Sequence, residues 1–187
     1  MTQRSNLLRR DDSMLLVIDV QERINAVMVD QGHLSRLEVL VEASHALAVP
    51  VLASEQYPKG LGPTLEGLAA TLGETPAVKM TFSCARETEL CEAVTAANRP
   101  QIVVTGIETH VCVLQTVLDL LAAGYEVHVP HDAVNSRRPA DKEWALRRME
   151  AAGATITSTE SALFELLERC DTDDFKIVAK LIKKIPV

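Results

Sequence analysis

Short apolar runs that alternate with amphipathic segments constrain the fold of this chain more than any other feature. The run 14–20 is apolar except at Asp19, as is typical of a strand buried on both faces. Further strand-like runs lie at 50–54, 77–80, 101–105, 125–129 and 155–157. Segments with helical character lie at 34–48, 86–97, 112–123, 139–152, 160–169 and 172–184, while Pro and Gly indicate a loop over 55–64. This order predicts a three-layer α/β/α fold with a mostly parallel, six-stranded, Rossmann-like sheet.

Length and charge narrow the classes of protein that remain. The chain has 187 residues and no internal repeat or linker, so we expect one domain over residues 1–187. Its formal net charge of −7 disfavours binding to nucleic acid or to an anionic membrane. We expect no secretory signal, and no apolar run reaches the ~20 residues of a membrane span. A cytoplasmic protein whose four cysteines are free thiols is therefore expected.

Three reactive side chains lie at the ends of apolar runs. Asp19 is a carboxylate near the end of the first run, Lys79 lies near the end of the third, and Cys112 opens a helix after the fourth. The carboxyl ends of parallel strands share one edge of a sheet, where ligands bind. We therefore expect an acid, a base and a thiol to meet in one crevice.

This set suits nucleophilic catalysis. The reactive form of cysteine is the thiolate, and both a helix N-terminus and a nearby ammonium group lower the pKa of a thiol. A buried carboxylate can take up the proton and later return it to a leaving amine. Each residue also has a simpler interpretation: Asp19 as a loop hydrogen-bond acceptor, Lys79 as a solvated cation, and Cys112 as a small buried side chain. Their joint placement at one sheet edge favours the catalytic interpretation.

Three fragments carry a family resemblance. They are VIDVQ at 17–21, KMTFS at 79–83 and GIETHVCV at 106–113. In this order and spacing they resemble the signature segments of isochorismatase-like hydrolases. The segments 55–64 and 175–184 resemble more closely the subgroup of isochorismatase domain-containing proteins, which extends the similarity to nearly the whole chain.

The resemblance implies a role for each member of a catalytic triad. Asp19 would be the general acid and base, Lys79 the polarising cation and Cys112 the nucleophile. Backbone N–H groups of Glu108 and Cys112 would form an oxyanion hole beside a cis peptide bond between Ile107 and Glu108. The cysteine implies an amidohydrolase acting on a small amide, ureide or carbamoyl compound. Relatives are oligomers, so a homo-oligomer such as a dimer or tetramer is implied.

Substrate-binding residues are implied with alternatives left open. The resemblance and the loop after the second strand nominate Gln56, Tyr57, Phe82, Thr109 and His110. Gln56 and Tyr57 could equally lie outside the pocket, and His110 could be a surface residue. Asp132 and Arg137 could touch substrate, although loop and helix-capping roles are favoured for them.

No metal and no cofactor are expected. Nicotinamidases of this family bind a metal through an Asp-x-His motif after the second strand, where this chain reads SEQYP at 54–58. The five histidines of the chain offer no spaced ligand set either. A metal site and nicotinamidase activity are therefore both disfavoured.

Two other classes of function compete with an amidohydrolase. A non-catalytic interaction protein could use the same fold, because fold does not fix function. A nucleotide-binding protein is disfavoured, since no G-x-G-x-x-G follows the first strand and no Walker lysine motif is present. The intact triad favours catalysis, and fast alkylation of Cys112 near neutral pH would separate an enzyme from a scaffold.

Overall fold

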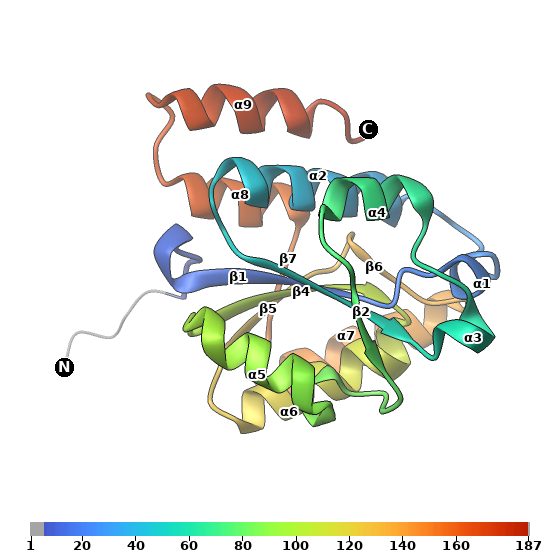
Figure 1. Ribbon diagram of the computed structural model, residues 1–187. Helices are drawn as coiled ribbons and strands as arrows, with labels where there is room; N and C mark the ends of the chain where they lie inside the picture. Colours follow the sequence, from blue (N-terminus) through green and yellow to red (C-terminus); the bar gives the residue numbers. More distant parts are fainter. Residues whose placement is uncertain (1–5, 187) are drawn as a thin grey trace.

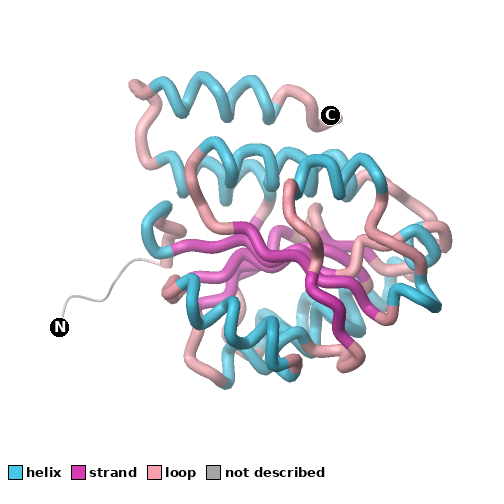
Figure 2. The backbone as a smooth tube through the Cα atoms, viewed as in Figure 1, coloured by secondary structure: helices cyan, strands magenta, loops and turns pink. Residues whose placement is uncertain are grey.

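A computed structural model of the chain describes residues 6–186. Residues 1–5, part of the segment where we expect no secretory signal, and residue 187 lie outside the described part. Within residues 6–186, one seven-stranded parallel sheet is covered by helices on both faces (Figures 1 and 2). The α/β prediction is therefore confirmed.

The sheet has one more strand than the sequence predicted. The strands are β1 (Ser13–Ile18), β2 (Val51–Gln56), β3 (Ala77–Lys79), β4 (Gln101–Ile107), β5 (Glu126–Pro130), β6 (Val134–Asn135) and β7 (Thr155–Thr157). They run in the order β3-β2-β1-β4-β5-β7, with β6 beside the end of β4, and the pairings are parallel. The strand β6 is only two residues long, which is too short to show a period in the sequence.

Helices cover the two faces of the sheet unequally (Figure 1). One face carries α2 (His33–Ala46), α4 (Glu66–Leu72) and α8 (Thr159–Leu167), and α9 (Asp173–Ile182) lies outside them against α2 and α8. The other face carries α5 (Thr88–Ala97), α6 (Leu114–Ala122) and α7 (Pro139–Ala151). The short elements are η1 (Arg10–Asp12), α1 (Glu22–Asn25), α3 (Pro58–Leu61), η2 (Cys84–Arg86) and η3 (Thr109–Val113). No helix within residues 6–186 is both long and apolar enough to cross a membrane.

The central strand β1 explains why its sequence shows no alternation. Every residue of β1 is buried, because β2 and β4 flank it and helices cover both of its faces. Leu15 and Val17 pack in the core beneath α2, whereas Met14, Leu16 and Ile18 pack in the core beneath α5 and α6. Burying an aliphatic side chain stabilises a fold by about 1.5–3 kcal/mol, so this strand anchors both cores.

Several short elements differ from the sequence-based expectation. The segment expected to be a loop contains α3, and the helices α1 and α4 had no counterpart in the prediction. Elements of four to seven residues span at most two helical turns, so they carry little periodic signal. The sequence predicts Cys112 as the first residue of a helix, but helical structure begins earlier. Cys112 lies within η3, a single π-helical turn, and α6 begins only at Leu114.

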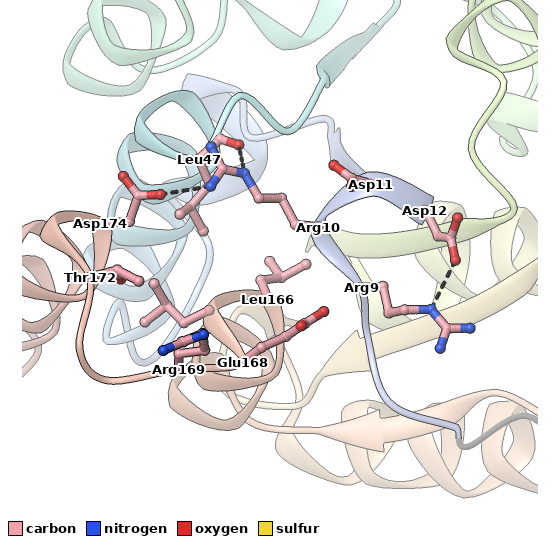
Figure 3. Close-up of a pocket in the computed structure, with 11 residues that line it drawn as sticks. Arg9, Arg10, Asp11, Asp12, Leu47, Leu166, Glu168, Arg169, Thr172 and Asp174 are labelled. Atoms are coloured by element: carbon pink, nitrogen blue, oxygen red, sulfur yellow. Dashed lines mark hydrogen bonds and ion pairs between the residues drawn. The ribbon is translucent and has the colours of Figure 1, made fainter.

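The C-terminal helix α9 is fixed at its start as predicted. The Thr172 hydroxyl accepts a hydrogen bond from the Phe175 amide at 3.1 Å. A cavity of about 260 Å³ lies nearby, where η1 and the ends of α2 and α8 meet α9 (Figure 3). There the Arg10 guanidinium donates to the Leu47 carbonyl and to Asp174 Oδ2 at 2.6 Å. This cavity lies at the amino-terminal ends of the strands, and its arginines bind the protein's own groups.

Candidate active site

The structure brings Asp19, Lys79 and Cys112 together at the carboxyl edge of the sheet. Asp19 directly follows β1, Lys79 ends β3, and Cys112 lies in η3 after β4. Lys79 Nζ is 2.8 Å from Asp19 Oδ2, and neither side chain is exposed to solvent. Cys112 is 5% exposed and interacts with the Asp19 carboxylate. Strands that are far apart in sequence thus deliver a carboxylate, an ammonium group and a thiol to one place.

The Lys79 ammonium group is held by oxygen atoms on several sides. Besides Asp19, it donates to Gln56 Oε1 at 2.7 Å and to the carbonyls of Thr81 and Phe82 at 3.2 and 3.0 Å. Burial opposes charge on this group, but the neighbouring Asp19 and Cys112 raise the pKa of Lys79 above its usual value. The lysine is therefore a fixed cation at neutral pH.

The backbone at Asp19 adopts an unusual conformation. Its φ is 52°, in the left-handed region that non-glycine residues seldom adopt. The Asp19 amide donates to the Ser54 carbonyl at 3.1 Å, and the Ser54 hydroxyl donates to Asp19 Oδ1 at 2.7 Å. Such conformations persist where surrounding contacts over-determine them, and they cluster at functional sites.

A glycine permits β4 to approach β1 closely just before Asp19. A Cβ atom added to Gly106 of β4 would lie 2.1 Å from the carbonyl oxygen of Ile18 in β1, and the φ of Gly106 is 114°. Both the contact and the backbone conformation exclude a side chain. Gly106 therefore lets β4 run beside the residue before Asp19.

The ionisation of Cys112 differs from the expectation drawn from the sequence. Burial, followed by the negative charge of Asp19, raises the pKa of Cys112 well above its usual value, although Lys79 acts in the opposite direction. The cysteine also lies inside the π-helical turn, so the lowering expected from a helix N-terminus does not prevail. At neutral pH the resting site therefore holds a thiol beside a carboxylate.

The Ile107–Glu108 peptide bond is cis, as the resemblance implies. The Glu108 carbonyl accepts the amides of Val111 and Val113 at 3.0 and 3.3 Å, which begins the η3 turn. The Glu108 carboxylate is bound by Arg137 through the backbone N–H, Nε and Nη2 at 3.1, 2.9 and 2.7 Å. Burial opposes ionisation, but these hydrogen bonds lower the pKa of Glu108. Three hydrogen bonds from Arg137 thus hold Glu108 as a carboxylate.

A cavity of about 320 Å³ opens onto Cys112. Its polar lining residues are Arg23, Gln56, Glu108, Cys112 and Arg137. Its apolar lining residues are Ile24, Val27, Leu61, Phe82 and Val111. A volume of this size suits a small, compact molecule.

The nominated substrate-binding residues divide into two groups. Gln56 and Phe82 line the cavity, whereas Tyr57, Thr109 and His110 are not among its lining residues. The Tyr57 ring lies over Gly60, where an added Cβ would come within 2.3 Å of it. Thr109 is fully buried, and His110 Nδ1 lies 3.0 Å from Ser136 Oγ.

Sequence reasoning missed much of the cavity lining. It did not nominate Arg23, Ile24, Val27, Leu61 or Val111, and it favoured a structural role for Arg137. Arg23 and Ile24 lie in the short helix α1, and Val27 follows it. Nothing in this part of the sequence marks the residues that face a pocket. Asp132 is a loop anchor, since its carboxylate accepts the amide and hydroxyl of Thr159 at 2.8 and 3.0 Å.

The described residues contain no cluster of three or more His, Cys, Asp or Glu side chains that could hold a metal ion. The cysteines Cys84, Cys91, Cys112 and Cys170 are free thiols. The reactive groups of the candidate site are therefore a thiol, a carboxylate and an ammonium group.

Comparison with known sequences points to one family. The isochorismatase domain model matches residues 13–161. The secreted isochorismatase effector Isc1 of Phytophthora sojae is 39% identical, over 98% of this chain and 90% of its own. Isochorismatase domain-containing protein 2 of Bos taurus is 37% identical, over 92% of this chain and 83% of its own.

Solved structures agree with the sequence comparison. A structure described as the MAR1 ribonuclease from Caenorhabditis elegans superposes with a TM-score of 0.89 at 35% identity, over 97% of this chain and 95% of that one. YcaC of Escherichia coli, described as an octameric hydrolase of unknown specificity, gives a TM-score of 0.92 at 22% identity, over 98% of this chain and 93% of that one. The second likeness concerns the fold alone. With the family model covering most of its length, this chain belongs to the isochorismatase family, whose members are hydrolases.

Proposed function

We propose that this chain hydrolyses a small amide, ureide or carbamoyl compound with Cys112 as the nucleophile. One observation carries the proposal: a fully buried Asp19–Lys79 ion pair adjoins a buried thiol that faces a small cavity. Burying a carboxylate, an ammonium group and a thiol together is costly, so their joint presence favours a catalytic role.

The first half of the proposed reaction forms an acyl-enzyme. The Cys112 thiol gives its proton to Asp19, and its sulfur attacks the carbonyl carbon of the substrate. The resulting oxyanion is held by the backbone N–H groups of Glu108 and Cys112. Asp19 returns the proton to the leaving nitrogen, the carbon–nitrogen bond breaks, and a thioester with Cys112 remains.

The second half releases the acyl group. Asp19 takes a proton from a water molecule, which attacks the thioester carbonyl. The carbon–sulfur bond then breaks, and the sulfur regains the proton from Asp19. Deacylation by water resembles the reverse of acylation, so the same carboxyl group can act in both halves.

Lys79 gives this proton transfer its electrostatic balance. When the proton moves from Cys112 to Asp19, the negative charge moves from oxygen to sulfur, and no new charge is created in the buried site. The Lys79 cation, 2.8 Å from Asp19 Oδ2, faces a single negative charge throughout. In a low-dielectric pocket this avoids the large cost of separating or creating charge.

A ribonuclease is the second candidate, because three similar structures are described as a MAR1 ribonuclease, two of them with that description marked as unproven. An RNA strand carries many negative charges, and this chain has a formal net charge of −7. The cavity beside Cys112 is also small, at about 320 Å³. Both observations favour a small neutral group over a polynucleotide as the substrate.

We further propose that the protein acts in the cytoplasm as a homo-oligomer. The octameric YcaC supports an oligomer, whereas the secreted Phytophthora relative shows that location varies among relatives. The free thiols found in the structure suit a reducing compartment.

The test is hydrolysis of a panel of small amides, ureides and carbamoyl compounds, with an RNA substrate as a separate arm. We expect turnover of at least one panel member, loss of that turnover in Cys112→Ala, and a trapped acyl-enzyme visible by mass spectrometry. Cys170→Ala is the matched control, since Cys170 is exposed and free. Full activity of Cys112→Ala on a confirmed substrate would show that Cys112 is not the nucleophile. A protein with neither a substrate nor an unusually reactive thiol would instead be an interaction protein.

A further inference from the structure

A serine of strand β2 contacts Asp19 through both its main chain and its side chain. Ser54 pairs with Ile18 in the sheet, and its carbonyl accepts the Asp19 amide at 3.1 Å. Its hydroxyl donates to Asp19 Oδ1 at 2.7 Å, and the residue is only 2% exposed. Water therefore does not compete for this hydrogen bond.

A second cysteine fixes the direction of the Ser54 hydroxyl. Cys84 Sγ donates to Ser54 Oγ at 3.5 Å, a normal contact for sulfur. Burial, followed by the charge of Asp19, raises the pKa of Cys84 to about 11, so at neutral pH this thiol keeps its proton. The Cys84 amide is tied to Thr116 Oγ1 of α6 at 2.9 Å. The Ser54 oxygen thus accepts from Cys84, and its own proton points to Asp19.

The two oxygen atoms of Asp19 consequently have different surroundings. Oδ1 accepts the Ser54 hydroxyl. Oδ2 lies 2.8 Å from Lys79 Nζ in the buried ion pair, and no hydroxyl among the described residues donates to it. A new proton on Oδ2 displaces no hydroxyl hydrogen bond, whereas a proton on Oδ1 would compete with the Ser54 hydroxyl.

We propose that Ser54 is a positioning residue that occupies Asp19 Oδ1 and reserves Oδ2 for the proton of Cys112. This inference rests on the proposed function, in which Asp19 exchanges a proton with that thiol. Cys84 assists Ser54 in this role, because its hydrogen bond keeps the Ser54 hydroxyl in the orientation that donates to Asp19.

The proposal predicts how the site responds to pH. The groups that face Asp19 are Lys79 from β3, Cys112 from η3, Cys84 from η2 and the Ser54 hydroxyl from β2. Lys79 and Ser54 stabilise the carboxylate, the Cys84 thiol stays neutral throughout, and the Cys112 thiol stays neutral until the proton transfer. Removing the Ser54 donor therefore weakens the stabilisation of the charged carboxylate relative to its protonated form.

Iodoacetamide reports this change without knowledge of the substrate. The Cys112 sulfur bonds to the reagent's methylene carbon, iodide leaves, and the thiol proton stays on Asp19 Oδ2. The rate falls at low pH because a protonated Asp19 cannot accept that proton. Alkylation of each cysteine is followed between pH 4 and 9 by peptide mass spectrometry, with the exposed Cys170 as the internal reference.

Four variants complete the design. Ser54→Ala removes the donor, and Ser54→Thr restores a hydroxyl at the same place. Ser13→Ala is the matched control, because Ser13 is a buried strand serine whose hydroxyl bonds to Gln101 at the opposite end of β1. Cys84→Ala leaves the Ser54 hydroxyl in place but frees its orientation, and it serves if Ser54→Ala fails to fold.

The expected result has two linked parts. In Ser54→Ala the midpoint of the acid limb moves up by about one to two pH units, and the plateau rate rises instead of falling. The rise follows because a more basic Asp19 withdraws the thiol proton more readily, whereas simple structural damage would slow the reaction. Ser54→Thr and Ser13→Ala should retain the wild-type midpoint, and Cys84→Ala should shift it upward by less.

Different results overturn different conclusions. A wild-type midpoint in folded Ser54→Ala, or in Cys84→Ala where the first variant does not fold, overturns the role of Ser54. If wild-type Cys112 shows no acid limb and follows the profile of Cys170, the triad itself fails and with it the proposed function.

Discussion

Replacing Lys79 with methionine tests the energetics of the buried ion pair. At 2.8 Å between Nζ and Asp19 Oδ2, and an effective dielectric constant of about 20, the Coulomb attraction is about 6 kcal/mol. Removing one member of a buried pair costs about 3–5 kcal/mol, because the other charge remains without compensation. Methionine keeps most of the apolar stem of lysine, so little of this cost comes from packing. We expect the free energy of unfolding at pH 7 to fall by about 3–5 kcal/mol.

Urea denaturation followed by circular dichroism measures this change and its sign with pH. As the pH falls, Asp19 in the variant takes up a proton, the unpaired charge disappears, and the deficit relative to wild type shrinks. Adding Asp19→Asn to Lys79→Met should recover part of the loss. Recovery should be incomplete, since Gln56 Oε1 and the Phe82 carbonyl still lack the donor that Lys79 supplied. A single variant as stable as wild type, or a double variant less stable than the single, would refute the reasoning.

Two further predictions concern residues outside the triad. Burial and the nearby Lys142 charge lower the pKa of His33 to about 4, while its Nδ1 lies 3.1 Å from the Asn135 amide nitrogen. As the pH falls, the unfolded chain protonates His33 before the folded chain does, so His33 should lower the free energy of unfolding by about 3 kcal/mol between pH 6.5 and 4. In urea titrations His33→Gln should therefore lose less stability over this pH range than wild type. An equal loss in both proteins would contradict this. Gly106→Ala should lower stability by more than about 4 kcal/mol in thermal melts, because its Cβ would meet the Ile18 carbonyl. Gly124→Ala is the control, with a φ of 90° but open space around the new Cβ, and equal losses in both variants would show that the contact is unimportant.

The apolar runs of the sequence predicted the framework because burial leaves a direct trace in residue type. A strand with helices on both faces must be apolar throughout, as β1 is, and a carboxylate at its end is then conspicuous. The same logic placed Asp19, Lys79 and Cys112 at one edge. The cis bond before Glu108 came from the family resemblance, and the structure confirms it.

Other features of the site leave no such trace. Ser54 is a small polar residue in a short strand, and its contact with Asp19 depends on the register of β2 against β1. Arg137 reaches the cavity through a loop after β6, a strand too short to predict. The raised pKa of Cys112 depends on burial by distant segments, which outweighs the effect expected from its place in the sequence.

The cavity is lined both by residues of the central sheet region and by residues of short helices outside it. Gln56 ends β2 and Cys112 lies just after β4, whereas Ile24 and Leu61 project from the four-residue helices α1 and α3. Substitutions in such peripheral segments disturb few core contacts, so they can accumulate without unfolding the protein. A lineage could therefore exchange one substrate for another by altering these walls alone. Divergence of specificity among descendants would then proceed faster than divergence of chemistry, and two homologues with the same triad need not share a metabolite.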